Sequence, residues 1–411
     1  MAQSFFDKIQ KLLGIWPQAV SLVACLLLFW ELGECEDRLP LTIRSRSAVL
    51  IDGVTGQAVF EKNSKARFSP ASLVKTMTLY LAFDALKNGR TKPDQEVLVS
   101  EKAWKMGGSQ MFLEVGDKVA FTELLKGVAA ISANDGSVAI AEFLDGSEEA
   151  FVLKMNEKAE ALGLKDTHFV NSHGLFVEGQ LSTAYDMATL GLHYVRNHPD
   201  ALSLHTIPEY EYKGIKQRNW NRLLEVDKRV DGLKTGYLSD SGYHLLVSAK
   251  KGEQRFIGAI MGAETAQGRD KDALQLLEFG FKNFMTKALA KKGEIVGNVK
   301  VQKGKSPELA LCAEDTVLVT IRKEKADRLQ VKKEIPQFVT APIVKGQTLG
   351  RLIAEEDGLP RREVNLVAVA DVPAKSFTRF YQMGFLIVMG LLTLAVWRIR
   401  ALKKRQNRGF M

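Results

Sequence analysis

Residues 380–397 are the feature of the sequence that most restricts its fold: FYQMGFLIVMGLLTLAVW, a run without a charged side chain. As a helix rising about 1.5 Å per residue, the run spans roughly 27 Å, close to the thickness of the hydrocarbon core of a bilayer. A helix that is apolar on every face is either buried in a large protein core or surrounded by lipid. The run alone leaves both interpretations open.

The charges after this run favour the membrane. The formal net charge of the 411-residue chain is +9, and basic residues crowd its end: Arg398, Arg400, Lys403, Lys404, Arg405 and Arg408. A basic segment directly after an apolar span is typical of the cytoplasmic side. We therefore expect a transmembrane helix at 380–397, a basic cytoplasmic tail at 398–411, and the main body outside the cytoplasm. No other basic cluster carries interleaved aromatic residues, so the charge does not predict a nucleic-acid partner.

The N-terminal residues 1–35 have the pattern of a secretory signal. Two lysines precede the apolar segment 19–30, and small residues precede a cleavage point after Cys35. Two alternatives stay open: lipidation at Cys25, where the sequence resembles a lipoprotein box, and retention of the segment as a second anchor. Cleavage after Cys35 would leave Cys312 as the only cysteine, so we expect no intrachain disulfide.

Between these segments, the spacing of apolar residues predicts two domains. In residues 36–290, two strands come first, helices fill 121–197, strands return after residue 229, and a last amphipathic helix is expected at 272–289. This order predicts an α+β domain, an antiparallel sheet flanked by helices, with a cleft between the sheet and the helical side. Residues 294–375 contain short alternating segments, which predict a small all-β domain, most simply a sandwich.

Three short motifs carry candidate chemistry: SLVK at 72–75, SAN at 132–134 and KTG at 234–236. Each motif is weak alone. Ser-x-x-Lys also fits an exposed helix start, and Ser248 with Lys251 repeats its spacing by coincidence. Ser-x-Asn is equally typical of a turn or a helix cap. The three in this order, each in the element that its role requires, are far more specific.

The first motif has a physical basis as a nucleophile and its base. Ser69 and Pro70 predict a helix start, which puts Ser72 in the first turn and Lys75 one turn further on the same face. A serine hydroxyl needs a base to remove its proton, and a lysine is such a base only when burial or nearby positive charge lowers its pKa. Lys234 would supply that charge and attract a substrate carboxylate.

With the longer blocks around them, the motifs resemble those of the low-molecular-mass penicillin-binding proteins, the serine-type D-alanyl-D-alanine carboxypeptidases of bacterial cell walls. The resemblance extends over nearly all of the chain after the signal, including APIVKGQTLGRL at 341–352 in the β domain. It implies a β-lactamase-like catalytic domain and two sets of site residues. The catalytic set is Ser72, Lys75 and Ser132, and the substrate-binding set is Asn134, Lys234, Thr235, Gly236, Tyr237 and Arg269.

The resemblance also implies a reaction. The terminal D-alanine of peptidoglycan stem pentapeptides would leave through an acyl-enzyme on Ser72, with the backbone N–H groups of Ser72 and Tyr237 as oxyanion hole. β-Lactams would acylate the same serine, and no cofactor or metal is expected. The expected location is the bacterial inner membrane, with the catalytic domain on the periplasmic side; a homodimer is left open.

Some residues depart from the family pattern or have a second interpretation. Tyr237 stands where relatives often have histidine, and Trp220-Asn221-Arg222 replaces an Asn-Arg-Asn-like stretch; both concern substrate preference. Arg269 fits a solvated helix start equally well, and we interpret His173 as a structural loop residue.

Other functions were weighed against this one. A muropeptide DD-endopeptidase would use the same residues. A β-lactamase needs a second base, and the Glu-x-x-x-Asn pattern of class A enzymes does not occur between Ser132 and Lys234. A non-catalytic wall-binding protein is disfavoured because Ser72, Lys75 and Lys234 are all intact.

Overall fold

The computed structural model describes residues 41–356, 359–375 and 378–406. The expected secretory signal at 1–35, with Cys25 and Cys35, lies outside the described residues. The predicted domain limits, 36–290 and 294–375, stay predictions.

An antiparallel sheet of five strands organises the region that carries the three motifs, in the order β2-β1-β11-β10-β9. Strand β1 comes from the start of this region and pairs with β11 from its end, in register from Ser47 with Met261 to Asp52 with Phe256. The early and late strands thus complete one sheet, as predicted, and β9 forms one edge of it. The strands are β1 (Ser47–Asp52), β2 (Ala58–Lys62), β9 (Val230–Leu238), β10 (Gly242–Lys251) and β11 (Gln254–Ala263).

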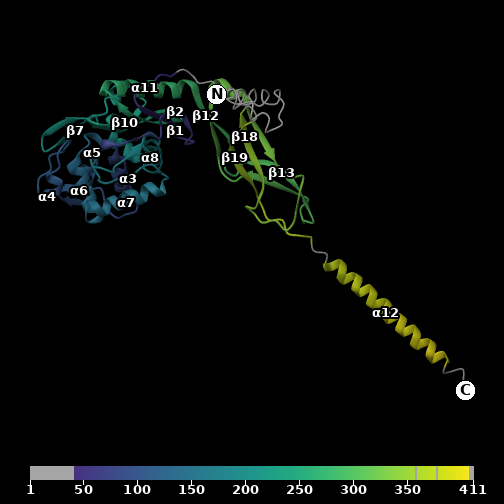
Figure 1. Ribbon diagram of the computed structural model, residues 1–411. Helices are drawn as coiled ribbons and strands as arrows, with labels where there is room; N and C mark the ends of the chain where they lie inside the picture. Colours follow the sequence, from purple (N-terminus) through teal and green to yellow (C-terminus); the bar gives the residue numbers. More distant parts are fainter. Residues whose placement is uncertain (1–40, 357–358, 376–377, 407–411) are drawn as a thin grey trace, which may run out of the picture. The chain divides into compact units, whose positions relative to one another are not determined.

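Helices cover both faces of this sheet (Figure 1). Helix α11 packs against β10 and β11 on one face, and α8 packs against β1 and β11 on the other. The remaining long helices gather on the side of α8, so the predicted α+β arrangement is confirmed. The helices are α3 (Lys75–Lys87), α5 (Phe121–Ala130), α6 (Asn134–Asp145), α7 (Glu148–Ala161), α8 (Ala184–Asn197) and α11 (Ala266–Asn283).

Helix α3 lies in the interior and brings Lys75 with it. Its side chains at Met77, Leu79 and Tyr80 are buried against the sheet and the neighbouring helices. A helix with apolar residues on all faces packs inside a protein, and each fully buried large apolar side chain contributes about 1.5–3 kcal/mol. Because Lys75 is the first residue of α3, this packing fixes its backbone in the core.

Short elements connect these long ones. The segment with Ser72 is a 3₁₀ helix, η1 (Ala71–Val74), directly before α3. The others are β3 (Arg67–Phe68), β4 (Glu96–Leu98), α4 (Glu101–Trp104), β5 (Lys118–Ala120), β6 (Ser182–Thr183), η2 (Pro199–Ala201), α9 (Leu202–His205), β7 (Glu209–Tyr212), β8 (Ile215–Arg218) and α10 (Leu223–Val226).

The prediction of a helix at 272–289 is wrong at its end. Helix α11 stops at Asn283, and the next residues form β12 (Phe284–Ala290). Strand β12 pairs with β15, from Phe284 opposite Arg322 to Ala290 opposite Val317. The partner strand, which begins only at Val317, decides the conformation of this segment.

The remaining strands form the predicted all-β region. Six of them make a second sheet in the order β16-β18-β19-β14-β13-β17, with a core of its own that includes Leu311, Leu352 and Leu366. The elements are β13 (Ile295–Gln302), β14 (Glu308–Ala313), β15 (Val317–Arg322), η3 (Lys323–Arg328), β16 (Leu329–Glu334), β17 (Phe338–Thr340), β18 (Thr348–Glu356) and β19 (Leu359–Ala368).

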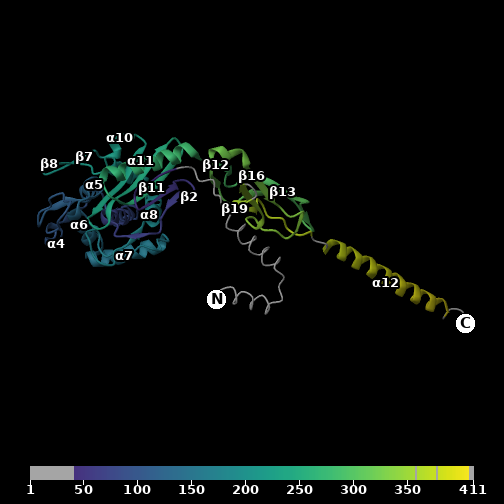
Figure 2. The same ribbon diagram turned by 45° about the horizontal axis from the view of Figure 1, so that its top comes forward.

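A single long helix, α12 (Thr378–Gln406), contains the apolar run (Figure 2). Its segment Gln382–Leu402 has a mean hydropathy of 1.9 and is not buried in the protein. The alternative of a buried core helix is therefore wrong, because nothing in the described chain covers these apolar side chains. The helix is long and apolar enough to cross a membrane.

Candidate active site

The three motifs, far apart in the sequence, meet at one cleft of about 360 Å³. The cleft lies where the η1 segment, the turn between α5 and α6, and the edge strand β9 come together. It is lined by Ser72, Ser109, Ser132, Trp220, Arg222, Thr235, Gly236, Tyr237, Tyr243, Ala266 and Arg269. Cleft and motifs thus coincide as the sequence predicted.

The helix start before Ser72 differs from the prediction. Ala71 adopts a left-handed φ of +51°, so an α-helix cannot begin at Pro70 and continue through it. Ser69 does not cap the helix, since its buried Oγ has no partner in the described chain. Ser72 instead lies in η1, and Lys75 begins α3. The 3₁₀ turn still brings Lys75 Nζ within 3.1 Å of Ser72 Oγ, as the three-residue spacing requires.

Lys75 is fully buried, and its ammonium group is surrounded by acceptors. Besides Ser72 Oγ, Nζ donates to Asn134 Oδ1 at 2.7 Å and to the backbone oxygen of His173. Three oxygen atoms thus lie within hydrogen-bond distance of Nζ. The side chain is therefore held in one place by groups from three separate segments of the chain.

The electrostatic surroundings lower the pKa of both site lysines. Burial, and then the positive charge of Lys234, hold the pKa of Lys75 well below its ordinary value. Burial, and then the charge of Arg269, lower the pKa of Lys234 to about 7. Burial disfavours the charged form of an amine, and a neighbouring cation acts in the same direction. The surroundings of Lys75 thus favour the neutral amine that a general base requires.

The second motif supplies a strained serine and a second contact for Lys75. Ser132 adopts a φ of +65°, which is uncommon outside glycine, and its buried Oγ has no hydrogen-bond partner within the described chain. Asn134, the first residue of α6, accepts from Lys75 and donates from Nδ2 to Gly107 O at 2.7 Å. The oxygen and the nitrogen of the Asn134 side chain therefore both form hydrogen bonds within the protein. A contact between Asn134 and the substrate stays a prediction.

The third motif lies in β9, at the edge of the sheet. Lys234 is buried and donates to Thr235 O at 2.9 Å. A Cβ at Gly236 would lie 3.2 Å from Ser72 N and 3.1 Å from Ala71 Cβ. Glycine is thus needed at 236 because any side chain would push β9 away from the segment that carries Ser72.

Arg269 lies in the cleft, in the first turn of α11. Only 5% of its surface is exposed, so the alternative of a solvated helix-start arginine is wrong. Its guanidinium pairs with Asp270 at 2.7 Å and lines the cleft together with Thr235. Arg269 is near enough to Lys234 for its charge to lower the pKa of that lysine, so two basic side chains lie close together at or beside the cleft.

Sequence reasoning missed the ring of Tyr243, the hydrogen bond made by Trp220 and the backbone oxygen of His173. Tyr243 stands opposite Tyr237 across the β9–β10 pairing, and their rings lie 4.3 Å apart. Trp220 donates from Nε1 to Ile131 O at 3.0 Å, next to Ser132. The register of the β9–β10 hairpin could have predicted that the two tyrosines lie opposite each other. The role of the His173 backbone oxygen could not be predicted, because every residue type has the same carbonyl group.

Comparison with known proteins gives a consistent result for both regions. The family model of the D-alanyl-D-alanine carboxypeptidases matches residues 35–265, and that of the penicillin-binding protein 5 C-terminal domain matches residues 284–374. The chain is 41% identical, over 346 residues, to D-alanyl-D-alanine carboxypeptidase DacF of Bacillus subtilis (strain 168), a match that covers 83% of this chain and 89% of that protein.

Solved structures agree with the family models. Penicillin binding protein 5 from Haemophilus influenzae is 34% identical with a TM-score of 0.78, covering 82% of this chain and 99% of that one. Penicillin-Binding Protein D2 from Listeria monocytogenes, in an ampicillin-bound form, is 29% identical with a TM-score of 0.55, covering 59% of this chain and 100% of that one. The fold predicted for the catalytic and β regions is confirmed.

Proposed function

The chain belongs to the D-alanyl-D-alanine carboxypeptidase family, and from this premise we propose that it removes the terminal D-alanine of peptidoglycan stem pentapeptides through an acyl-enzyme on Ser72. The observation that carries the serine mechanism is the surroundings of Lys75 Nζ, which lies 3.1 Å from Ser72 Oγ in a buried place that lowers its pKa. A neutral amine at this distance can accept the serine proton.

The contacts of Lys75 suit the neutral amine. It has two N–H bonds and one lone pair, and two of its three neighbours, Asn134 Oδ1 and His173 O, can only accept. The lone pair is then left for the hydroxyl of Ser72, which can donate. Ser72 Oγ attacks the carbonyl carbon between the two D-alanines while its proton passes to Lys75. The C–N bond breaks, and the released amine takes a proton through Ser132.

The two basic side chains at or beside the cleft would hold the terminal carboxylate of the substrate. Lys234 and Arg269 supply the charge, and Thr235 supplies a hydroxyl at the mouth of the cleft. The backbone N–H groups of Ser72 and Tyr237 are the proposed oxyanion hole, where each donor typically contributes about 3 kcal/mol to the transition state. Water then cleaves the ester on Ser72. A β-lactam, which has an amide carbonyl and a carboxylate at similar positions, would acylate the same serine.

We propose further that α12 anchors the enzyme in the bacterial inner membrane, with the catalytic region on the periplasmic side. The length and apolar composition of Gln382–Leu402 support a membrane span. The basic residues after it support a cytoplasmic C-terminus. The substrate, the stem peptide of the wall, lies on the same side as the proposed catalytic region.

Labelling and product release test the proposal. The full chain, purified in detergent, is incubated with a fluorescent penicillin and, separately, with a pentapeptide that ends in D-Ala-D-Ala. We expect stable labelling and release of D-alanine, both lost in Ser72→Ala. Ser248→Ala is the matched control, because Ser248 has the same spacing to Lys251, and it keeps both activities. Rapid penicillin hydrolysis without release of D-alanine would contradict the proposal.

A further inference from the structure

The turn at residues 171–175, here called the His173 turn, forms one wall beneath the nucleophile. The backbone oxygen of His173 accepts from Lys75 Nζ. Gly174 has a φ of +86°, and a Cβ there would lie 2.1 Å from Ala71 O, so the turn packs directly against the residue before Ser72. The position of this turn therefore decides whether Lys75 keeps its second N–H acceptor.

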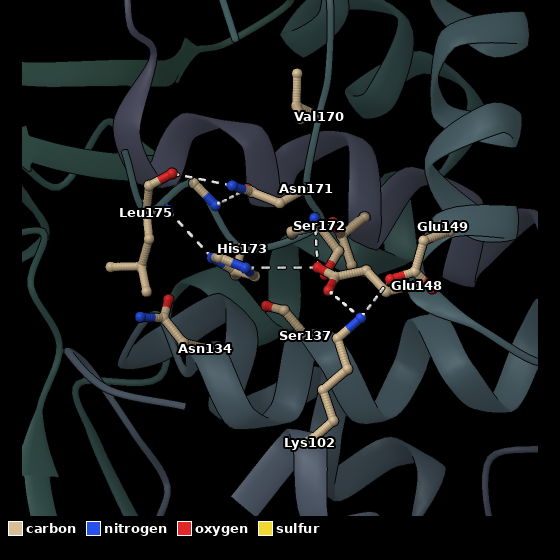
Figure 3. A network of polar contacts seen from close by, with 12 residues as sticks. Lys102, Asn134, Ser137, Glu148, Glu149, Val170, Asn171, Ser172, His173 and Leu175 are labelled. Atoms are coloured by element: carbon tan, nitrogen blue, oxygen red, sulfur yellow. Dashed lines mark hydrogen bonds and ion pairs between the residues drawn. The ribbon is translucent and has the colours of Figure 1, made fainter. Parts of the chain in front are cut away.

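Glu148, the first residue of α7, holds this turn at Ser172 (Figure 3). Its Oε1 accepts from Ser172 N at 2.9 Å and from Ser172 Oγ at 2.7 Å. The Glu148 side chain is 8% exposed, and the hydrogen bonds are buried. Two short bonds from one carboxylate oxygen thus fix the residue directly before His173.

The imidazole of His173 adds a contact to the same carboxylate. Its Nδ1 accepts from Leu175 N at 3.1 Å, which requires the proton of the neutral ring to be on Nε2. Nε2 lies 3.5 Å from Glu148 Oε1 (Figure 3), and burial lowers the pKa of His173 to about 4. The ring is therefore neutral and faces Glu148 rather than Ser72, which agrees with the expectation that this histidine is no catalyst.

Lys102, from α4, holds Glu148 in turn. Its Nζ lies 3.0 Å from Glu148 Oε2 and 2.8 Å from Oε1 of the exposed neighbour Glu149. Burial raises the pKa of Glu148, but the hydrogen bonds from Ser172 and from Lys102 bring it below its ordinary value. Glu148 is thus an ionised carboxylate with Lys102 on one oxygen and Ser172 on the other.

We propose that Glu148 is a positioning residue for acylation: through Ser172 it holds the backbone oxygen of His173 against Lys75 Nζ. The inference rests on the proposed role of Lys75 as the base. Glu148 touches neither the cleft nor Ser72, so it acts only through the His173 turn. The turn has other anchors, including Thr78 Oγ1, which donates to Ser172 O at 2.6 Å. Loss of Glu148 therefore shifts the turn without unfolding it.

Two substitutions separate the geometry of Glu148 from its charge. Glu148→Gln keeps the length and an oxygen that accepts from Ser172, but removes the charge. Glu148→Asp keeps the charge at the start of α7 but withdraws the oxygens by one methylene. A misplacement of about 1 Å in a reacting site costs up to about 100-fold in rate. We therefore expect Glu148→Asp and Glu148→Ala to acylate about 10- to 100-fold more slowly, and Glu148→Gln to remain close to the wild-type chain.

The measurement is stopped-flow acylation of the full chain in detergent by a fluorescent penicillin, which separates the first-order acylation rate from the non-covalent dissociation constant. We expect the acylation rate to change while the dissociation constant stays close to wild type, and the melting temperature of each variant shows whether it is folded. Glu149→Ala is the matched control: Glu149 also pairs with Lys102 but makes no contact with the His173 turn, so acylation is unchanged.

Each result decides a different question. If Glu148→Asp acylates as fast as the wild-type chain, Glu148 does not position the turn, and the inference is wrong. If Glu148→Gln is as slow as Glu148→Ala, the charge matters and not the position, which also overturns it. Should Glu148→Ala fail to fold, the aspartate and glutamine variants still decide. If the wild-type chain is not acylated, or Ser72→Ala still is, the proposed function itself fails.

Discussion

Replacement of Asn134 by aspartate tests whether Lys75 acts as a neutral base. Asn134 Oδ1 lies 2.7 Å from Lys75 Nζ, and Asn134→Asp puts a carboxylate of nearly the same shape at that position. An opposite charge in direct contact favours the ammonium form and raises the pKa of Lys75. Such contacts lower the fraction of the neutral form about 10- to 1,000-fold at a pH below the pKa. In the variant a smaller fraction of Lys75 is therefore in the neutral form that can act as the base, while Ser72 and the cleft keep their positions.

The pH profile of acylation distinguishes this effect from simple damage. Because the neutral fraction of Lys75 rises with pH, the acid limb of the profile moves to higher pH in Asn134→Asp, and the rate recovers when the pH is high enough. Loss of the bond from Asn134 Nδ2 to Gly107 O lowers the rate equally at every pH, by no more than about tenfold. Stopped-flow acylation of the full chain by a fluorescent penicillin, from about pH 5 to about pH 10, spans the ordinary pKa values of histidine and lysine.

A matched variant and a clear contrary result complete this test. Asn134→Ala removes the acceptor without adding a charge, so its acid limb does not move to higher pH. A profile for Asn134→Asp that falls equally at all pH values, with its acid limb unmoved, would refute the role of neutral Lys75. Such a result would mean that Asn134 matters only for packing or substrate contact.

Three further predictions use other parts of the structure. Arg269→Ala removes a positive charge that helps to lower the pKa of Lys234 to about 7, so we expect that pKa to rise. Lys234 then stays protonated to higher pH, and the increase of KM for D-alanine release with pH begins at a higher pH than in the wild-type chain. Gly174→Ala puts a Cβ 2.1 Å from Ala71 O at a left-handed φ that alone costs about 1–2 kcal/mol, so both melting temperature and acylation rate fall. A chain that ends at residue 375 no longer sediments with lipid vesicles, whereas the full chain does; sedimentation of both would mean that another segment also binds lipid.

The sequence predicted the elements whose signals are local, and failed where a distant partner decides the conformation. Strands β1, β2 and β9 to β11 follow from alternating apolar residues between turn-forming segments, and short connections predict the pairing of β1 with β2, of β9 with β10 and of β10 with β11. The residues after Asn283 continue a helical spacing, but they pair with β15 from residue 317 onward. No periodicity within 272–289 contains that information, because the partner strand lies outside this segment and begins only at Val317.

The same distinction applies to the site. The spacing of Ser72 and Lys75 predicted their contact, and the order of the three motifs predicted that the KTG motif meets the same cleft, because both depend on residue types that the sequence shows. The left-handed φ of Ala71 was not predicted, and neither was the contact between His173 O and Lys75. Both are properties of the backbone, and any residue type offers the same carbonyl oxygen.

Ser132 shows how strain in the free enzyme points to the position of the leaving group. A left-handed φ at a non-glycine residue costs about 1–2 kcal/mol, and a buried hydroxyl without a partner costs about 1–3 kcal/mol. Ser132 has both features, and it lies in the lining of the cleft beside Ser72. The nitrogen of a substrate amide placed between these two serines would be a hydrogen-bond partner for Ser132 Oγ. This nitrogen becomes a better acceptor as the C–N bond breaks, because it then gains basicity. Such a contact would be strongest in the transition state, which is where a contact must be strongest if it is to raise the rate.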